Sequence, residues 1–97
     1  MKVYLAQFTL EEKSIYGGCK VSEVVGVFST KGKAVTALKQ AIAAKSQGFA
    51  YPLLRRDLKE TDYMVDGERC IEIMYRKDFV GGHFVDCVGS IWPEEVK

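Results

Sequence analysis

The apolar residues of this chain change their spacing once, in the stretch VVGVFSTKGKAVTAL at residues 24–38. Before this switch they are β-branched and closely set, as in a strand, and after it they recur at the three- and four-residue steps of an amphipathic helix. Ser29 or Thr30 supplies the side-chain oxygen that accepts the free amides of a first helical turn. We therefore predict a helix at residues 31–46. Its apolar stripe should consist of Ala34, Leu38, Ala41 and Ile42.

The other apolar runs have the β-branched and aromatic residues, in loose alternation, that are typical of strands. We expect strands at residues 3–10, 20–28, 61–65, 69–75 and 83–92. Residues 11–19 should form a long exposed connection, Asp66-Gly67 a tight hairpin turn, and Pro93 the end of the last strand. The predicted order is β-β-α-β-β-β. This is an α+β fold, with a single antiparallel sheet of four to five strands and one main helix packed on one face.

Size and composition indicate a folded protein of ordinary globular type. The chain has 97 residues and is 47% hydrophobic, which is enough to bury one core. We expect one domain over residues 1–97. Fourteen Lys and Arg against thirteen Asp and Glu give a net charge of +1. Because no strong field attracts nucleic acid and the one helix lacks a basic stripe, we do not expect nucleic-acid binding.

No segment of the sequence indicates a membrane protein or a secreted one. The apolar runs are shorter than a membrane span, and the N-terminal stretch is too short and too polar for a secretory signal. Three cysteines without a close pair fit reduced thiols better than a disulfide framework. We expect a cytoplasmic protein.

The distance between His83 and Cys87 argues against both a metal site and a Cys-His catalytic pair. His83 and Cys87 share one face of a predicted strand but lie about 13 Å apart at ~3.3 Å per residue, whereas zinc–ligand bonds are only ~2.0–2.3 Å. The carboxylate pairs at residues 11–12 and 94–95 are adjacent in sequence and point apart in extended chain, so neither forms an acid–base pair. We predict no metal, no cofactor and no enzymatic activity.

Arginine and aromatic residues supply the best candidates for a binding surface. Arg55 and Arg56, with Lys59 nearby, lie between Tyr51 and Tyr63 in an irregular segment. Guanidinium groups pair two ways with carboxylate or phosphate, and tyrosines fill pockets in protein interfaces. The alternative is that these arginines pair with neighbouring charges on a solvated loop.

The last predicted strand alternates cleanly and places two aromatic residues on one face. Phe84, Val88 and Trp92 share that face, while Val85, Cys87 and Ile91 face the core. With one helix, the opposite face of the sheet is left open, so the surface around Trp92, bordered by Arg55 and Arg56, should form a homodimer contact or a partner site. The alternative is that residues 49–60 fold back over Phe84 and Trp92. The predicted partner-binding residues are Tyr51, Arg55, Arg56, Tyr63, Phe84 and Trp92.

A second candidate site lies at the start of the helix. Lys31, Gly32 and Lys33 would combine two ammonium groups, free amides and the helix dipole, an arrangement that favours an anion. Together with Arg55 and Arg56, they support an alternative function, the binding or sequestering of a nucleotide-like anion. Solvated lysines are the simpler interpretation.

The stretch VVGVFSTKGKAVTALKQAIAAK resembles a pattern of small phage and prophage accessory proteins of the α+β type. In these, a hairpin near the initiator Met is followed by a GVFST-like step into an alanine-rich helix; the similarity covers residues 1–48. The resemblance implies a virus-encoded protein that occupies a host protein or captures a small signal molecule. We therefore predict a non-enzymatic interaction module, a phage-type inhibitor or adaptor that binds a host protein in the host cytoplasm.

Overall fold

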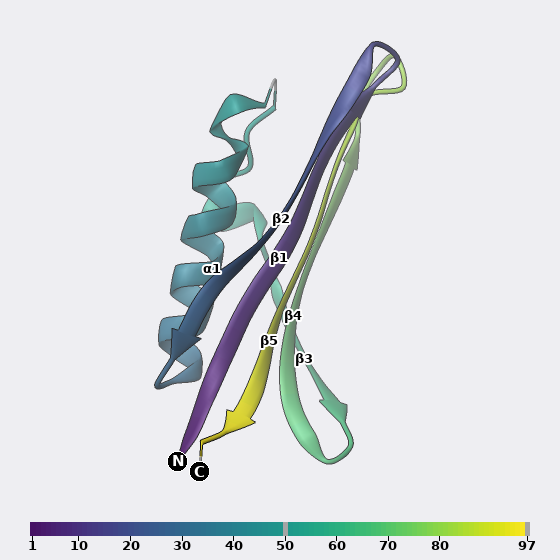
Figure 1. Cartoon of the computed structure of the whole chain (residues 1–97). Helices are drawn as coiled ribbons and strands as arrows, with labels where there is room; N and C mark the ends of the chain where they lie inside the picture. The colour runs from purple at the N-terminus through teal and green to yellow at the C-terminus, as the bar shows by residue number, and fades with distance from the viewer. Residues whose placement is uncertain (50, 97) are drawn as a thin grey trace.

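A computed structural model describes residues 1–49 and 51–96 and shows one antiparallel sheet with one main helix (Figure 1). In chain order, the elements are β1 (Lys2–Ser14), β2 (Gly17–Phe28), α1 (Lys31–Lys45), η1 (Ser46–Gly48), η2 (Arg55–Asp57), β3 (Glu60–Val65), β4 (Glu68–Asp78) and β5 (Phe84–Glu95). The strand order is β2-β1-β5-β4-β3, so β1 and β5, from opposite ends of the chain, lie side by side. The predicted α+β fold and its β-β-α-β-β-β order are confirmed.

The strands are longer than the sequence pattern predicted. β1 and β2 remain paired as far as Ser14 and Gly17, so the long connection expected at residues 11–19 is wrong, and a two-residue turn at Ile15 and Tyr16 replaces it. β5 also continues through Pro93, opposite β1. Its pairing with β4 begins only at Ile91, so the proline, which has no backbone N–H, costs no hydrogen bond on that side.

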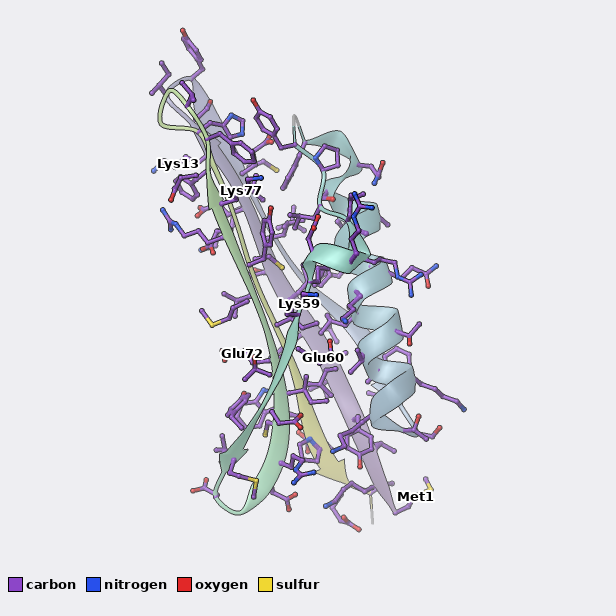
Figure 2. All side chains as sticks on the ribbon, turned by 180° about the vertical axis from the view of Figure 1, so that it is seen from behind. Met1, Lys13, Lys59, Glu60, Glu72 and Lys77 are labelled. Atoms are coloured by element: carbon purple, nitrogen blue, oxygen red, sulfur yellow. The ribbon has the colours of Figure 1, made fainter. Side chains whose placement is uncertain are left out.

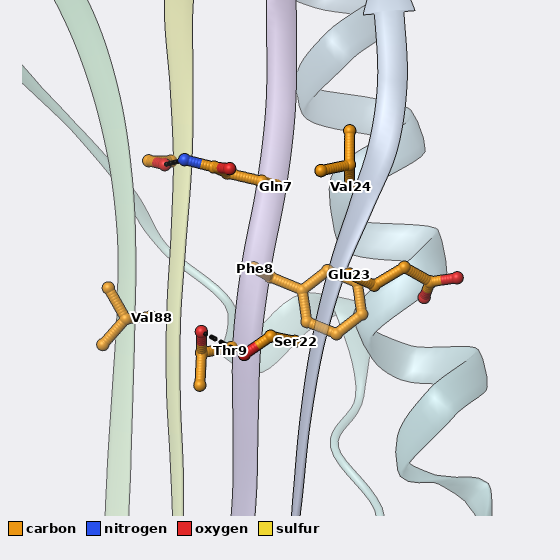
Figure 3. Close-up of a pocket in the computed structure, with 8 residues that line it drawn as sticks. Gln7, Phe8, Thr9, Ser22, Glu23, Val24 and Val88 are labelled. Carbon is orange, nitrogen blue, oxygen red and sulfur yellow. Dashed lines mark hydrogen bonds between the residues drawn. The ribbon is translucent and has the colours of Figure 1, made fainter.

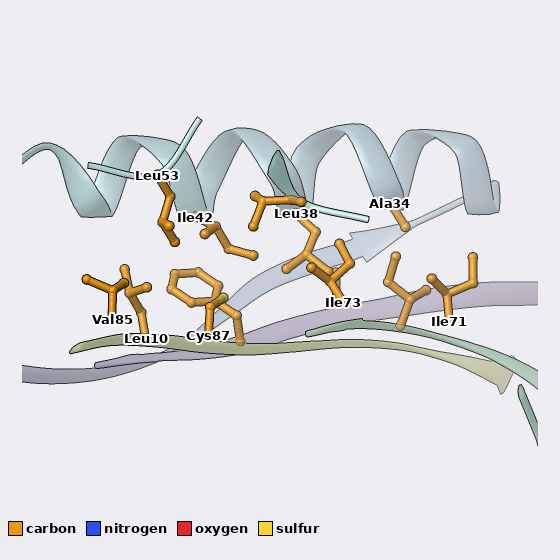
Figure 4. Packing of buried hydrophobic residues seen from close by; sticks show 13 residues of the cluster. Leu10, Ala34, Leu38, Ile42, Leu53, Ile71, Ile73, Val85 and Cys87 are labelled. Atoms are coloured by element: carbon orange, nitrogen blue, oxygen red, sulfur yellow. The ribbon is translucent and has the colours of Figure 1, made fainter. Parts of the chain in front are cut away.

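The helix begins and packs as its sequence predicts. The Thr30 side chain caps α1 by accepting a hydrogen bond from the Lys33 amide at 3.2 Å. Ala34, Leu38 and Ile42 are fully buried. Figure 4 shows their side chains pointing at the apolar residues of the sheet, among them Leu10, Ile71, Ile73, Val85 and Cys87.

A glycine in β5 sets how closely the helix approaches the sheet. A Cβ atom at Gly89 would lie 3.2 Å from Leu38 Cδ2 and 3.5 Å from Ile42 Cδ1. The distance to Leu38 is tighter than ordinary van der Waals contact and that to Ile42 is ordinary contact, so a side chain at residue 89 would require Leu38 to shift. The absence of a side chain at residue 89 therefore lets the middle of α1 rest directly on β5.

The connection after α1 completes the cover of the same face. Ser46 is buried, and its hydroxyl oxygen accepts a hydrogen bond from the Leu53 amide at 2.8 Å while its O–H donates to the Ala43 carbonyl at 2.9 Å. Leu53 and Leu58, on either side of η2, are each 1% exposed and belong to the core. The segment that the sequence showed as irregular is therefore held against the sheet beside the helix.

We predict that Leu38→Ala lowers the free energy of unfolding by about 2–5 kcal/mol, because it leaves a cavity between α1 and Gly89. Gln40→Ala, on the exposed side of the same helix, should change it by less than about 0.5 kcal/mol. Urea unfolding of both variants measures the difference. Equal stability of the two variants would contradict the packing described above.

Candidate protein-interaction surface

The sheet has one covered face and one open face. Figure 1 shows α1 and the connection that follows it on the same side of the sheet, so the described residues leave the other side uncovered. We call that side the open face. Opposite residues of paired strands point to one face, so the register assigns Leu5, Val27 and Trp92 to the open face together.

Several apolar side chains on the open face are exposed to solvent. Val24 and Val27 on β2 are 61% and 60% exposed, Met74 on β4 is 64% exposed, and Val88 on β5 is 41% exposed. Val24, Val27 and Val88 pair with Gln7, Leu5 and Thr9 on β1. Met74 pairs with Val88, so all four share this face. Single exposed apolar residues are common, but a group spread across one sheet face is typical of an interaction surface.

The sequence did not reveal the two valines of β2, because a β-bulge changes the alternation there. Ala6 pairs with Gly26 while Gln7 pairs with Val24, so Val25 is an extra residue in β2. As a result Val24 and Val27, three residues apart, lie on the same face. The only signal in the sequence is Gly26, which interrupts the valine run.

The centre of the open face is mostly polar and carries few charges. Thr9 Oγ1 and Ser22 Oγ lie 3.0 Å apart, and Gln7 Nε2 donates to Ser90 Oγ at 3.5 Å, as the dashed lines in Figure 3 show. These residues, with Val24 and Val88, line a shallow depression of about 400 Å³; Glu23 is its one charged lining residue. The side chains tie neighbouring strands together and leave a surface with few charges, in which Glu72, the register partner of Ser90, is the charged side chain of the central rows.

One end of the open face is closed by an aromatic pair. The rings of Tyr63 and Trp92 meet edge to face, with centroids 6.2 Å apart, and Cys70, the register partner of Tyr63, is fully buried. Burial raises the pKa of the Tyr63 phenol and of the Cys70 thiol. Two of the predicted partner-binding residues therefore lie together on the open face, and residues 51–60, which pack on the helix side, do not cover them.

Phe84 lies at the other end of the same face. It is paired with Lys13 on β1 and Asp78 on β4, and the Arg76 guanidinium carbon lies 4.5 Å from its ring centroid. It shares the open face with Trp92 but sits about 26 Å along the strand from it, at ~3.3 Å per residue. The predicted pair is on one face, although it does not form one cluster.

Tyr51 is placed elsewhere, at the end of the sheet beyond the helix. Its ring stacks on Phe79 with centroids 3.8 Å apart, and both rings meet His83 edge-on. His83 Nε2 lies 3.3 Å from Glu12 Oε2, and both side chains are largely buried. This cluster fastens the connection after α1 to the β4–β5 turn, and Tyr51 is not part of the open face.

Arg55 and Arg56 lie on the helix side of the sheet, in η2. With Lys39, Leu58, Lys59 and Glu60 they line a depression of about 530 Å³, which we call the basic depression. Figure 2 shows Lys59 and Glu60 beside η2 and α1. The arginines therefore do not border Trp92, and the six predicted partner-binding residues do not form one surface.

The residues at the start of α1 are separate from the basic depression. Lys33 Nζ donates to Ser29 Oγ at 3.4 Å, and Gly32 and Lys33 line a different hollow, next to Phe28. Lys31 precedes Lys39 by eight residues, which is about 12 Å along a helix. Lys31, Gly32 and Lys33 are thus not brought together with Arg55 and Arg56.

The three cysteines occupy three different environments. Cys19 on β2 is exposed, Cys70 is buried on the open face, and Cys87 is buried in the core, where burial and then the Asp86 carboxylate raise its pKa to about 12. Among residues 1–49 and 51–96, no group of three or more His, Cys, Asp or Glu side chains is arranged to hold a metal ion.

Comparison with known proteins identifies no relative. No family description matches the sequence, and neither a curated protein nor a solved structure is significantly similar to it. Within the described ranges, no helix has the length and apolar character needed to cross a bilayer. Function therefore has to be argued from the surfaces themselves.

We predict that a small thiol reagent modifies one cysteine per native chain, Cys19, because the other two are buried and their raised pKa values leave little thiolate. After denaturation all three cysteines should react. Mass spectrometry of peptides from both samples assigns the sites. Fast native labelling of Cys70 or Cys87 would contradict the burial described here.

Proposed function

We propose that this chain is a non-enzymatic protein-interaction module and that its open face is the binding surface. The occupant that we propose for this face is a second copy of the same chain. The observation that carries the proposal is the group of four exposed apolar side chains, Val24, Val27, Met74 and Val88, on a sheet face that nothing in the described residues covers.

The area of the open face matches what a stable dimer needs. Five strands at ~4.8 Å spacing are about 24 Å wide, and strands of 12–13 residues at ~3.3 Å per residue are about 40 Å long. Because β3 is short, the usable face is on the order of 800 Å². Each subunit of a standard interface buries about 800 Å². Two such faces can pack as the layers of a sandwich, about 10 Å apart.

The charge distribution also permits the face to bind itself. A two-fold axis brings each row of residues near the axis against its own copy, so a charged centre would place like charges together. Here the central residues are Gln7, Thr9, Ser22, Val88 and Ser90, and Glu72 is the one charged side chain in their rows. The charged residues of β1 and β5, such as Glu11 and Asp86, lie nearer the end of the face.

Dimerisation through the open faces would leave the helical sides of both copies outward. Those outer surfaces are then available to a further partner, which the resemblance to phage accessory proteins implies is a host protein. Under this proposal the chain is a dimeric, phage-type inhibitor or adaptor that acts in the host cytoplasm.

We predict that Val88→Asp weakens self-association at least about tenfold, since it places two carboxylates in the buried centre of the interface. The variant should stay folded, because Val88 is 41% exposed in the single chain and a carboxylate there remains solvated. Sedimentation equilibrium over a concentration series measures the dissociation constant.

Val80→Asp is the matched control, because Val80 is 100% exposed in the β4–β5 turn and outside the open face. It makes the same chemical change and should leave the dimer intact. A wild-type chain that is monomeric at every concentration would contradict the proposal. So would a Val88→Asp variant that dimerises like Val80→Asp.

A further inference from the structure

We propose that the basic depression on the helix side binds the oligophosphate group of a small anionic ligand. This inference is independent of the open face, since the two surfaces lie on opposite sides of the sheet. It rests on the side chains that η2, α1 and the start of β3 bring together: Lys39, Arg55, Arg56, Lys59 and Glu60.

The side chains that line the basic depression carry more positive than negative charge. Lys39 Nζ forms an ion pair with Glu60 Oε2, and that pair lowers the pKa of the Glu60 carboxyl below its usual value. In the described part of the chain, Arg55, Arg56 and Lys59 form no ion pair. Four cations and one carboxylate give the lining a charge of +3, although the whole chain carries only +1.

One further carboxylate, Asp57, lies in the η2 turn but is not counted in this sum. Asp57 belongs to the same turn as the arginines, but it does not line the depression. After burial, its charge is the other cause that raises the pKa of Tyr75 on β4, so Asp57 interacts with the sheet as well as belonging to the turn. The three unpaired cations are left to repel one another across the depression, and a multiply charged anion between them removes that repulsion.

The backbone that carries these cations is held in place. Leu53 and Leu58 anchor the two ends of the η2 segment in the core, and the turn is closed by hydrogen bonds from the Asp57 amide to the Leu54 carbonyl at 2.9 Å and from the Leu58 amide to the Arg55 carbonyl at 3.2 Å. An anion therefore does not have to order the backbone when it binds. Paired arginines on a fixed backbone suit phosphate, because each guanidinium presents a planar fork of donors.

The lining also indicates which part of the ligand is recognised. A volume of about 530 Å³ is within the range of small-molecule sites. None of the lining side chains is aromatic, and the one apolar residue, Leu58, is 1% exposed, so the lining offers charged groups and no apolar pocket for a base. Recognition should depend on the number of phosphate charges and not on the nucleoside attached to them.

The test compares three probes by isothermal titration calorimetry in low salt: inorganic tripolyphosphate, ATP and adenosine. We expect tripolyphosphate and ATP to bind with dissociation constants within a few-fold of each other, and adenosine not to bind. The Arg55→Ala, Arg56→Ala double variant should weaken both anions at least tenfold. Both arginines are exposed, so thermal unfolding of that variant should be unchanged.

Two further variants separate a built site from general surface charge. Lys31→Ala, Lys33→Ala removes the same number of charges at the start of α1, outside the depression, and should leave binding within twofold of wild type. Glu60→Gln removes the carboxylate that competes for Lys39 and should tighten binding several-fold.

Three results would overturn the inference. The first is ATP binding without tripolyphosphate binding, which would show that the base is recognised. The second is an equal loss in the arginine and lysine double variants, which would show a diffuse effect of charge. The third is the absence of a measurable binding heat when tripolyphosphate or ATP is titrated into the wild-type protein.

Discussion

The structure depends on the packing of one helix against one face of a five-stranded sheet. The sheet is about 24 Å wide and a helix with its side chains is only about 10 Å across, so α1 needs the Leu53–Leu58 connection beside it to cover even that face. Gly89 lets Leu38 approach closely enough to make the contact. The described chain has no further element for the second face. That shortage explains why Val24, Val27, Met74 and Val88 are exposed together.

Periodicity in the sequence was sufficient to predict the fold, because each element has a dominant local signal. The spacing switch at Ser29-Thr30 located α1, and clean alternation assigned Val85, Cys87 and Ile91 to the core. Strand ends were not predicted, because the β1–β2 hairpin continues beyond the helix, where charged residues replace apolar ones. The burial of Leu53 and Leu58 was missed for a related reason: two leucines in an irregular segment have no period.

The candidate surfaces were only partly predictable, because sequence spacing does not say on which side of a sheet a connection lies. Trp92 lies on the open face as the alternation of its strand predicts, whereas the position of Tyr63 beside it follows from the pairing of β3 with β4. Arg55 and Arg56 go to the other side, where Lys39 of α1 joins them through the fold alone. The β-bulge at Val25 likewise acts through pairing with β1, and the sequence of β2 contains only Gly26 as a sign of it.

The central claim, that a second copy covers the open face, is tested most directly with the single tryptophan of the chain, Trp92, which lies on that face. Acrylamide quenching of its fluorescence should be weak in concentrated wild-type protein and increase on serial dilution, toward the value that Val88→Asp shows at every concentration. A dimer that buries the open face requires that difference between the two proteins. Identical quenching of wild type and Val88→Asp at all concentrations would contradict it.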